Sequence, residues 1–153
     1  MNESIIQFLL QQSCATICCV DEHNNPYCFS CFYAFNQVEG LLYFKSSVKS
    51  HHSILIKKKP VISGTILPDK LSKVIVKGIQ FEGIVLDVQH PLVKHALSNY
   101  LKKNPLAIAI PGEVWTIQIN HIKMTDSTNR FGKKMKWLRE EKANDLIPSP
   151  RLN

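Results

Sequence analysis

The segment from Gly40 to Leu55 carries the groups in this chain that are best suited to chemistry. It reads GLLYFKSSVKSHHSIL, so an apolar run leads through Ser46, Ser47 and Lys49 into an amphipathic stretch. Hydroxyl groups, a lysine and the free N–H groups of a helix start supply the positive potential and the unpaired donors that a phosphate monoester requires. We therefore expect an anion site here, for a phosphorylated cofactor or substrate.

The same residues also have a purely structural interpretation. Serine is a preferred N-cap residue, so a strand, serines and a capped helix also occur where a chain simply turns a corner. His51 and His52 follow at the expected helix start. No carboxylate that would orient either ring is readable nearby, which favours exposed polar histidines over catalytic acids. Both interpretations of the segment stay open on the sequence alone.

The surrounding pattern predicts many short strands with a few helices between them. Alternating apolar residues and Asn/Asp/Gly-rich turns mark the strands, and 3.6-residue spacing marks the helices. Gly78 and Gly83 fall inside one long strand and predict a bulge or bend. The expected elements are a helix at 2–12, strands at 15–21, 26–36 and 41–46, a helix at 50–58, strands at 61–67 and 73–88, a helix at 91–103 and a strand at 113–124. This order predicts a mainly β protein with capping helices (α+β), built as a closed or nearly closed barrel of about six strands.

Composition indicates one soluble domain. The 153 residues are 44% hydrophobic and 20% charged, which is enough for one core. The apolar patch near the N-terminus is short and lacks a basic leader, so we expect a packing helix, no membrane span and a cytoplasmic location. We expect residues 1–142 to form the domain and residues 143–153, with Pro148 and Pro150, to form a flexible tail.

The five cysteines are expected to be reduced core thiols. Their number is odd and no export signal precedes them, which argues against a disulfide framework. The spacing Cys28-x-x-Cys31 could suggest zinc, but both residues fall in an expected strand, where positions 28 and 31 point to opposite faces. We therefore expect no metal site. The cysteines are Cys14, Cys18, Cys19, Cys28 and Cys31.

The net charge of +7 makes an anionic ligand or a nucleic acid a possible partner. Three lysines at 57–59 are explained by the end of a helix, whose dipole favours cations. A second basic group, at 133–139, is interleaved with Phe131, Met135 and Trp137, a pattern that could pack on a partner. Tyr27, Phe29 and Tyr33 share one strand face and could stack bases, but they equally fit one wall of a barrel. A nucleic-acid partner is therefore the least favoured interpretation.

No common catalytic motif is present. The chain lacks a Rossmann glycine signature, a P-loop, a Gly-x-Ser-x-Gly elbow and a His-Glu-x-x-His pair. No nucleophile or acid/base dyad is readable, so any chemistry would come from a bound cofactor.

Several motifs resemble those of the FMN-binding split-barrel proteins related to pyridoxamine 5'-phosphate oxidase, and more narrowly their small YhbP-like branch. The most specific is Thr125-Asp126-x-Thr128-x-x-Phe131-Gly132-Lys133-Lys134-Met135-x-Trp137-Leu138-Arg139. LYFKSSVKSHH, VISGTI, KGIQFEG and VWTI add to it, and the resemblance covers roughly residues 1–140.

The resemblance implies a split β-barrel homodimer with FMN in a groove between the subunits. Lys49 corresponds to the family's phosphate-contacting lysine, and Ser46, Ser47, Ser50 and His52 flank it. The family's usual arginine is Val48 here, which puts strong phosphate affinity in doubt. The residues implied to lie near the flavin ring or to close the groove are Cys28 to Phe32 (including Ser30 and Cys31), Gln80, Trp115, Lys133 and Trp137.

Some of these residues have structural alternatives. Trp115 alternates with Ile117 and Ile119 and could be a core residue, and Gln80 could satisfy a backbone group at a bulge. The tail IPSPRLN does not reproduce an arginine-rich substrate segment, so vitamin B6 oxidation is not expected. The resemblance implies a flavin-dependent oxidoreductase of unknown substrate. A flavin- or haem-binding module without turnover, or a basic nucleic-acid-binding barrel, are the alternatives.

Overall fold

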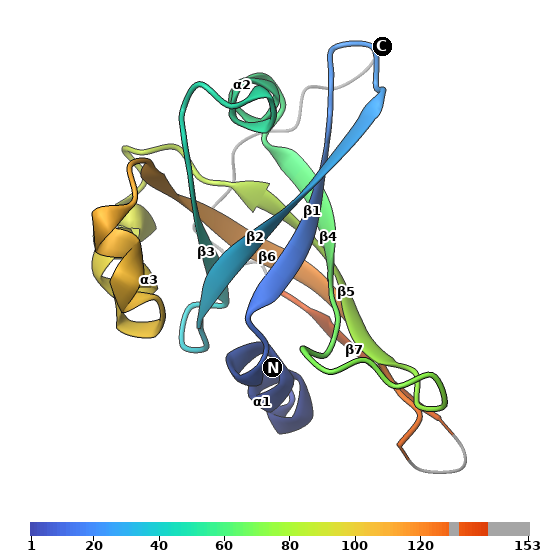
Figure 1. Ribbon diagram of the computed structural model, residues 1–153. Helices are drawn as coiled ribbons and strands as arrows, with labels where there is room; N and C mark the ends of the chain where they lie inside the picture. The colour runs from blue at the N-terminus through green and yellow to red at the C-terminus, as the bar shows by residue number, and fades with distance from the viewer. Residues whose placement is uncertain (129–131, 141–153) are drawn as a thin grey trace.

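The computed structural model describes residues 1–128 and 132–140, which form seven strands and several helices around one barrel (Figure 1). The predicted tail at 143–153 and Phe131 lie outside the described residues. The helices are α1 (Glu3–Gln11), α2 (His51–Lys58) and α3 (Ala96–Lys103), with 3₁₀ turns η1 (Pro91–Val93) and η2 (Pro105–Ala109). The strands are β1 (Cys14–Val20), β2 (Pro26–Asn36), β3 (Leu41–Ser46), β4 (Val61–Ile66), β5 (Lys77–Val85), β6 (Glu113–Asp126) and β7 (Lys133–Leu138).

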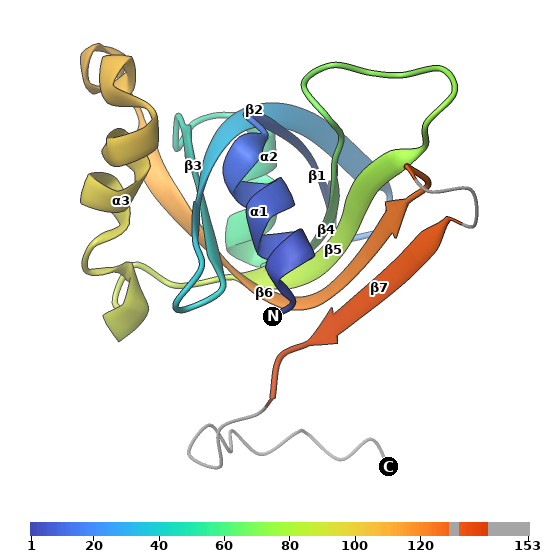
Figure 2. The same cartoon turned by 90° about the horizontal axis from the view of Figure 1, so that it is seen from below.

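Six strands close into an antiparallel barrel. Their order is β3-β2-β1-β4-β5-β6, and β3 also pairs with β6 from Leu41 opposite Gln118 to Ser46 opposite Glu113. β7 adds to the free half of β6 and lies outside the closed ring, as Figure 2 shows. The predicted fold class is therefore confirmed: a mainly β barrel with helices at its ends.

Every second side chain of each strand points inward, and these side chains fill the barrel interior. Large side chains with almost no exposed surface, such as Ile17, Phe44, Phe81 and Ile122, come from four different strands and form one core. Because side chains alternate across a strand, the same strands present serine, threonine, glutamine and lysine to the outside. The alternation thus produces both the core and a polar outer surface.

Helices α1 and α2 cover opposite ends of the barrel, and α3 packs on its outer wall (Figures 1 and 2). α1 contributes Ile5, Phe8 and Leu9 to the barrel core, whereas α2 contributes Leu55 and Ile56. α3 instead builds a smaller second core with β2 and β3. The helix that begins next to the predicted anion site is therefore fixed by its buried apolar face.

Three departures from the predicted elements are larger than two residues. The strand predicted at 73–88 is only Lys77–Val85, because Ser72 Oγ accepts hydrogen bonds from Val74 and Ile75 N–H and holds a turn there. The helix predicted at 91–103 is divided into η1 and α3. β7 was not predicted as a strand, so the sheet has seven strands rather than about six.

Of the two glycines predicted to mark a bulge, Gly83 does so. The register with β6 shifts between Glu82 and Gly83, so that His121 faces Glu82 and Ile119 faces Gly83. A Cβ on Gly83 would lie 2.5 Å from the carbonyl oxygen of Gln118, so only glycine fits this close approach. No register shift occurs at Gly78.

The expectation that all cysteines are reduced is wrong for one pair. Cys18 and Cys28 face each other across β1 and β2, with Cα atoms 4.3 Å apart, and their sulfur atoms are bonded. Spacing along the chain could not show this, because it is the register of the hairpin that opposes the two residues. Cys14, Cys19 and Cys31 are free.

No helix within residues 1–128 and 132–140 is long and apolar enough to cross a membrane.

Candidate functional site

The predicted anion site lies at the corner between β3 and α2. Ser46 ends β3, and the turn is held by Ser50 N–H, which donates to the Ser47 carbonyl at 3.1 Å. Gly112 (φ +136°) packs against this corner, and a Cβ there would lie 3.1 Å from the Ser46 carbonyl oxygen. β3 thus delivers the serines to the barrel end where α2 begins.

Ser50 is the N-cap residue of α2 by position, but its side chain makes no cap bond. Its Oγ lies instead 2.8 Å from the Ser47 carbonyl, 2.8 Å from Ser53 Oγ and 3.0 Å from His52 Nε2, with Ser46 Oγ at 3.2 Å. One hydroxyl serves three partners at most, so this cluster can rearrange. The first-turn N–H groups of α2 are left without the side-chain acceptor that a capping serine supplies.

His52 stands between the serines and the aromatic wall of the barrel. Its Nε2 is 2.7 Å from Ser46 Oγ, and its ring stacks on Phe29 with centroids 3.7 Å apart and planes 11° apart. Burial, and secondarily the neighbouring His51, lowers the pKa of His52 below its ordinary value. Its pKa therefore favours a neutral, hydrogen-bonding ring near neutral pH.

Lys49 is exposed at the tip of the turn and keeps its ammonium group available. Its backbone N–H donates to Ser47 Oγ at 3.2 Å, and no salt bridge involves its side chain among the residues that the structure describes. The corner therefore combines a free cation, several hydroxyls and an uncapped helix start. This combination can hold a phosphate group.

A hollow of about 510 Å³ lies on the outer face of the barrel and crosses five strands. Gln80, a predicted site residue, lines it together with the Cys18–Cys28 disulfide. Sequence reasoning missed three other wall residues, whose only signal was the outward phase of β5 and β6: Glu82, His121 and Lys123. His121 Nδ1 and Glu82 Oε1 are 3.8 Å apart across the bulge.

The stretch Cys28–Phe32 presents its residues alternately to the two faces of β2. Ser30 faces outward and shares a 3.1 Å hydrogen bond with Thr16 Oγ1. Phe32 is also outward, 65% exposed, and lines a second hollow with Leu67 and Leu71. Cys31 packs against the barrel core, and burial, with a lesser effect of Cys14, raises the pKa of its thiol to about 12.

Trp115 lies in the barrel wall. Its ring stacks on Phe44, with centroids 6.2 Å apart, and the Lys57 ammonium lies 5.8 Å from its centre. Phe44 in turn contacts Phe29, which stacks on His52. Trp115 is thus separated from the anion corner by two aromatic rings.

Lys133 and Trp137 lie far from the corner within one chain. Ser46 pairs with Glu113 at the start of β6, whereas Lys133 pairs with Asp126 at its other end. Thirteen residues of strand separate these pairs, about 40 Å along β6. Lys133 is exposed, while Trp137 packs against the core and carries the Arg139 guanidinium 5.5 Å from its ring centre.

The aromatic face of β2 is largely occupied within the barrel. Tyr33 is fully buried, with its hydroxyl donating to the Leu9 carbonyl at 2.7 Å, and Phe29 is covered by His52. Of Tyr27, Phe29 and Tyr33, only Tyr27 is exposed, and its ring contacts His51 edge-on. This face therefore offers no stacking platform for nucleic-acid bases.

The closed barrel with its capping helices defines the split-barrel class. It is similar to a haem-binding protein from Mycobacterium smegmatis (TM-score 0.71, 11% identity), covering 90% of this chain and 59% of that one. It is also similar to a protein described as an F420 reductase (TM-score 0.59, 17% identity, covering 80% and 98%). A third similar structure is an FAD-binding protein from Mesorhizobium loti (TM-score 0.60, 15% identity, covering 80% and 92%).

Sequence relatives identify the family more narrowly. The chain is 33% identical over 135 residues to a UPF0306 protein of Photorhabdus laumondii, covering 88% of this chain and 94% of that protein. It is 30% identical over 125 residues to the UPF0306 protein YhbP of Salmonella schwarzengrund, covering 82% and 85%. The chain therefore belongs to the UPF0306 family. No family model matches it.

Proposed function

We propose that this protein binds FMN and acts as a flavin-dependent oxidoreductase. The observation that carries the proposal is the β3–α2 corner, where a serine at the N-cap position leaves the helix start uncapped beside a free lysine. A helix start without a cap favours an external anion, because its N–H groups and dipole need an acceptor. A structural corner would use Ser50 as the cap.

The residues present fit the phosphate end of FMN. Lys49 supplies the positive charge, Ser47 is exposed, and Ser46 and Ser50 can turn their hydroxyls from each other to a ligand. His52, stacked on Phe29, shares a 2.7 Å hydrogen bond with Ser46 and so holds the cluster in place. Val48 supplies no charge, so we expect moderate rather than very tight phosphate affinity.

The ring end of FMN would lie along the outer face of the barrel, where Ser30 and Phe32 of β2 and Gln80 of β5 are accessible. FMN itself supplies the hydride or electron transfer when bound. The chain's contribution is to bind and orient the ring and to stabilise negative charge on it through nearby cationic and N–H groups. Lys123, which lines the same hollow as Gln80, is such a cation.

The proposal includes a homodimer and a cytoplasmic location. Phe32, Leu67 and Leu71 expose apolar surface around one hollow of the outer face, as a subunit contact would require. A second subunit is also the way in which Lys133 or Trp137 could reach the corner, since they are remote from it within one chain.

Titration with FMN and with riboflavin, followed by flavin fluorescence, tests the proposal. Riboflavin lacks only the phosphate. We expect it to bind at least about tenfold more weakly than FMN, because it loses one charge-assisted contact. Equal affinity for the two would remove the phosphate site. A shift and sharpening of the haem Soret band on adding the protein, with no binding of FMN, would replace the flavin proposal with haem binding, the property named for the mycobacterial neighbour.

A further inference from the structure

The pair Cys18–Cys28 lies on the outer face of the barrel and not in its core. Both cysteines line the hollow of about 510 Å³, and Cys28 is exposed while Cys18 is half-buried. Thr16 on the same strand as Cys18 and Ser63 on the adjacent strand β4 line the hollow beside them. Small molecules can therefore reach the two sulfur atoms.

The β1–β2 hairpin does not need this bond to hold its shape. Its ladder runs through seven register pairs, from Cys14 opposite Phe32 to Val20 opposite Pro26. The turn is closed separately by Asp21, whose carboxylate accepts from His23 N–H at 2.8 Å and from Asn25 N–H at 2.9 Å. The bond closes a loop of two cysteines only 10 residues apart, and short loops give the smaller entropic stabilisation, so we expect the paired hairpin to keep its fold after reduction.

The three other cysteines differ from this pair in their position or in the reactivity of their thiols. Cys19 is buried on the opposite face, and burial raises the pKa of its thiol. Burial likewise raises the pKa of Cys31 to about 12, so it carries almost no thiolate at neutral pH. Cys14 is exposed and free at the start of β1.

We propose that Cys18 and Cys28 form a reversible thiol–disulfide exchange site for low-molecular-weight thiols. A thiolate attacks Sγ of Cys28, the more exposed sulfur, forming a mixed disulfide and releasing the Cys18 thiolate. A second thiolate attacks the sulfur of the small molecule in that mixed disulfide. Two thiols are thereby oxidised to one small disulfide, and the protein disulfide is reduced to two cysteine thiols. This proposal does not depend on flavin binding.

Glutathione is a suitable probe. The native protein is equilibrated in buffers whose ratio of reduced to oxidised glutathione spans about a thousandfold range, and accessible thiols are then counted by alkylation and mass spectrometry. We expect Cys14 to carry a glutathione adduct at the oxidised end, and three accessible thiols at the reduced end, where Cys18 and Cys28 are added to Cys14. The Cys14→Ser variant should change from no free thiol and no adduct to two free thiols, and the Cys18→Ser/Cys28→Ser variant should change at Cys14 alone.

Three outcomes would overturn the proposal. In the Cys14→Ser variant, thiols that stay free at the oxidised end would show that the pair does not close, and a disulfide that survives the reduced end would make it a permanent link. Unfolding on reduction, seen by circular dichroism, would make the bond structural. The single variants test the direction of attack: Cys18→Ser, which retains Cys28, should form the glutathione adduct several-fold faster than Cys28→Ser, and equal rates would remove Cys28 as the attacked sulfur.

Discussion

The β3–α2 corner and the C-terminal hairpin are both rich in polar motif residues, yet they use them in opposite ways. At the corner, Ser46, Ser50 and His52 bond chiefly to one another, and Lys49 keeps its ammonium free. In the hairpin formed by the end of β6 and by β7, Asp126, Ser127 and Arg139 are committed to the backbone or to a fixed ion pair. The corner can therefore exchange its partners for a ligand, whereas the hairpin cannot do so without losing structure.

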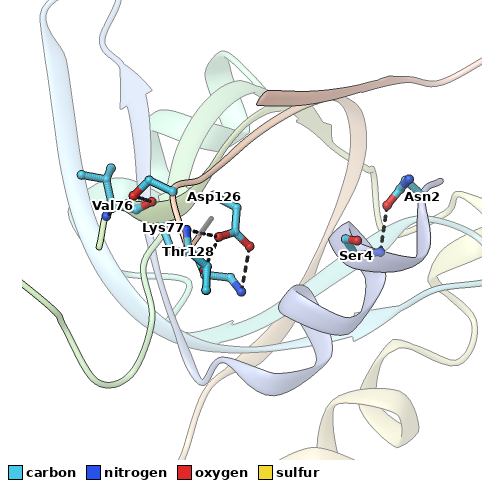
Figure 3. A network of polar contacts seen from close by, with 7 residues as sticks. Asn2, Ser4, Val76, Lys77, Asp126 and Thr128 are labelled. Atoms are coloured by element: carbon cyan, nitrogen blue, oxygen red, sulfur yellow. Dashed lines mark hydrogen bonds and ion pairs between the residues drawn. The ribbon is translucent and has the colours of Figure 1, made fainter. Parts of the chain in front are cut away.

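Asp126 shows how the hairpin uses its motif residues (Figure 3). Its carboxylate accepts from Thr128 N–H at 3.0 Å and from the Thr128 hydroxyl, and it forms a 3.0 Å ion pair with Lys77. These contacts, the Thr128 hydroxyl first, lower the pKa of Asp126 to about 2. The neighbouring Ser127 exchanges backbone and hydroxyl bonds with Val76. This part of the most recognisable motif thus ties the start of β5 to the end of β6.

Arg139→Ala should have the largest effect and should act on stability alone. The guanidinium donates to the carbonyls of Ile119 at 2.8 Å, Glu39 at 2.9 Å and Gly40 at 2.8 Å. Loss of these bonds should lower the free energy of unfolding by about 3 kcal/mol, measured by urea denaturation. Lys136→Ala, an exposed change on β7 shortly before Arg139, should cost no more than about 0.5 kcal/mol. Weaker FMN binding by the folded Arg139→Ala protein would remove the contrast between the two regions.

Lys49→Glu should act in the opposite sense, on binding and not on stability. Reversal of the charge beside the phosphate should weaken FMN about 100-fold, while riboflavin affinity stays unchanged. Lys94→Glu, an exposed site outside the corner, makes the same change in net charge and serves as the control. If both variants weaken FMN equally, the effect is one of overall charge and the corner is not the phosphate site.

Asp126→Asn should lower the free energy of unfolding by about 1 kcal/mol at neutral pH. The wild type should show the matching pH dependence. Because the pKa of Asp126 is lower in the folded chain than in the unfolded one, its contribution is present above about pH 4 and is lost as the pH falls toward about 2. Denaturation curves between pH 5 and 2 for both proteins measure this. If Asp126→Asn loses as much folding stability between pH 5 and 2 as the wild type does, Asp126 is not the group responsible for that loss.

Ser50→Ala should separate capping from ligand binding. A capping serine typically contributes about 1 kcal/mol of stability, but Ser50 makes no cap bond, so we expect a change below about 0.5 kcal/mol. FMN affinity should fall roughly tenfold if the hydroxyl binds phosphate. A stability loss of the full capping size without any change in binding would favour a corner that is only structural.

The smallest effect concerns His52. Its pKa, followed by NMR, should lie below the ordinary histidine value and should move back toward it in Phe29→Ala, because burial is the main cause of the shift. The unfolded chain binds this proton at a higher pH than the folded one does. Acidification through the window just below pH 6.5 should therefore reduce stability slightly. An unchanged pKa in Phe29→Ala would show that burial against this ring is not its cause.

The sequence by itself determined the elements whose signals are local. The bounds of β2 and β3 follow from apolar runs between polar turns, and they are confirmed without change. The serines and Lys49 between β3 and α2 could be recognised as a candidate site because donors, charge and helix start are contiguous there. The fold class followed from the count and order of such elements, since antiparallel strands with short turns have few ways to bury one face. Whether the predicted site residues bind a cofactor stays a prediction.

Only the tertiary structure decided which distant residues meet. Closure of the barrel brings β3 against β6, and the hairpin register sets Cys18 opposite Cys28. The bulge between β5 and β6 sets His121 opposite Glu82, and both line one hollow with Gln80. The family resemblance assigned Lys49 and Lys133 to one FMN site, whereas β6 holds them apart within one chain. Such contacts depend on strand order and register, which many non-local interactions set together and no single segment encodes.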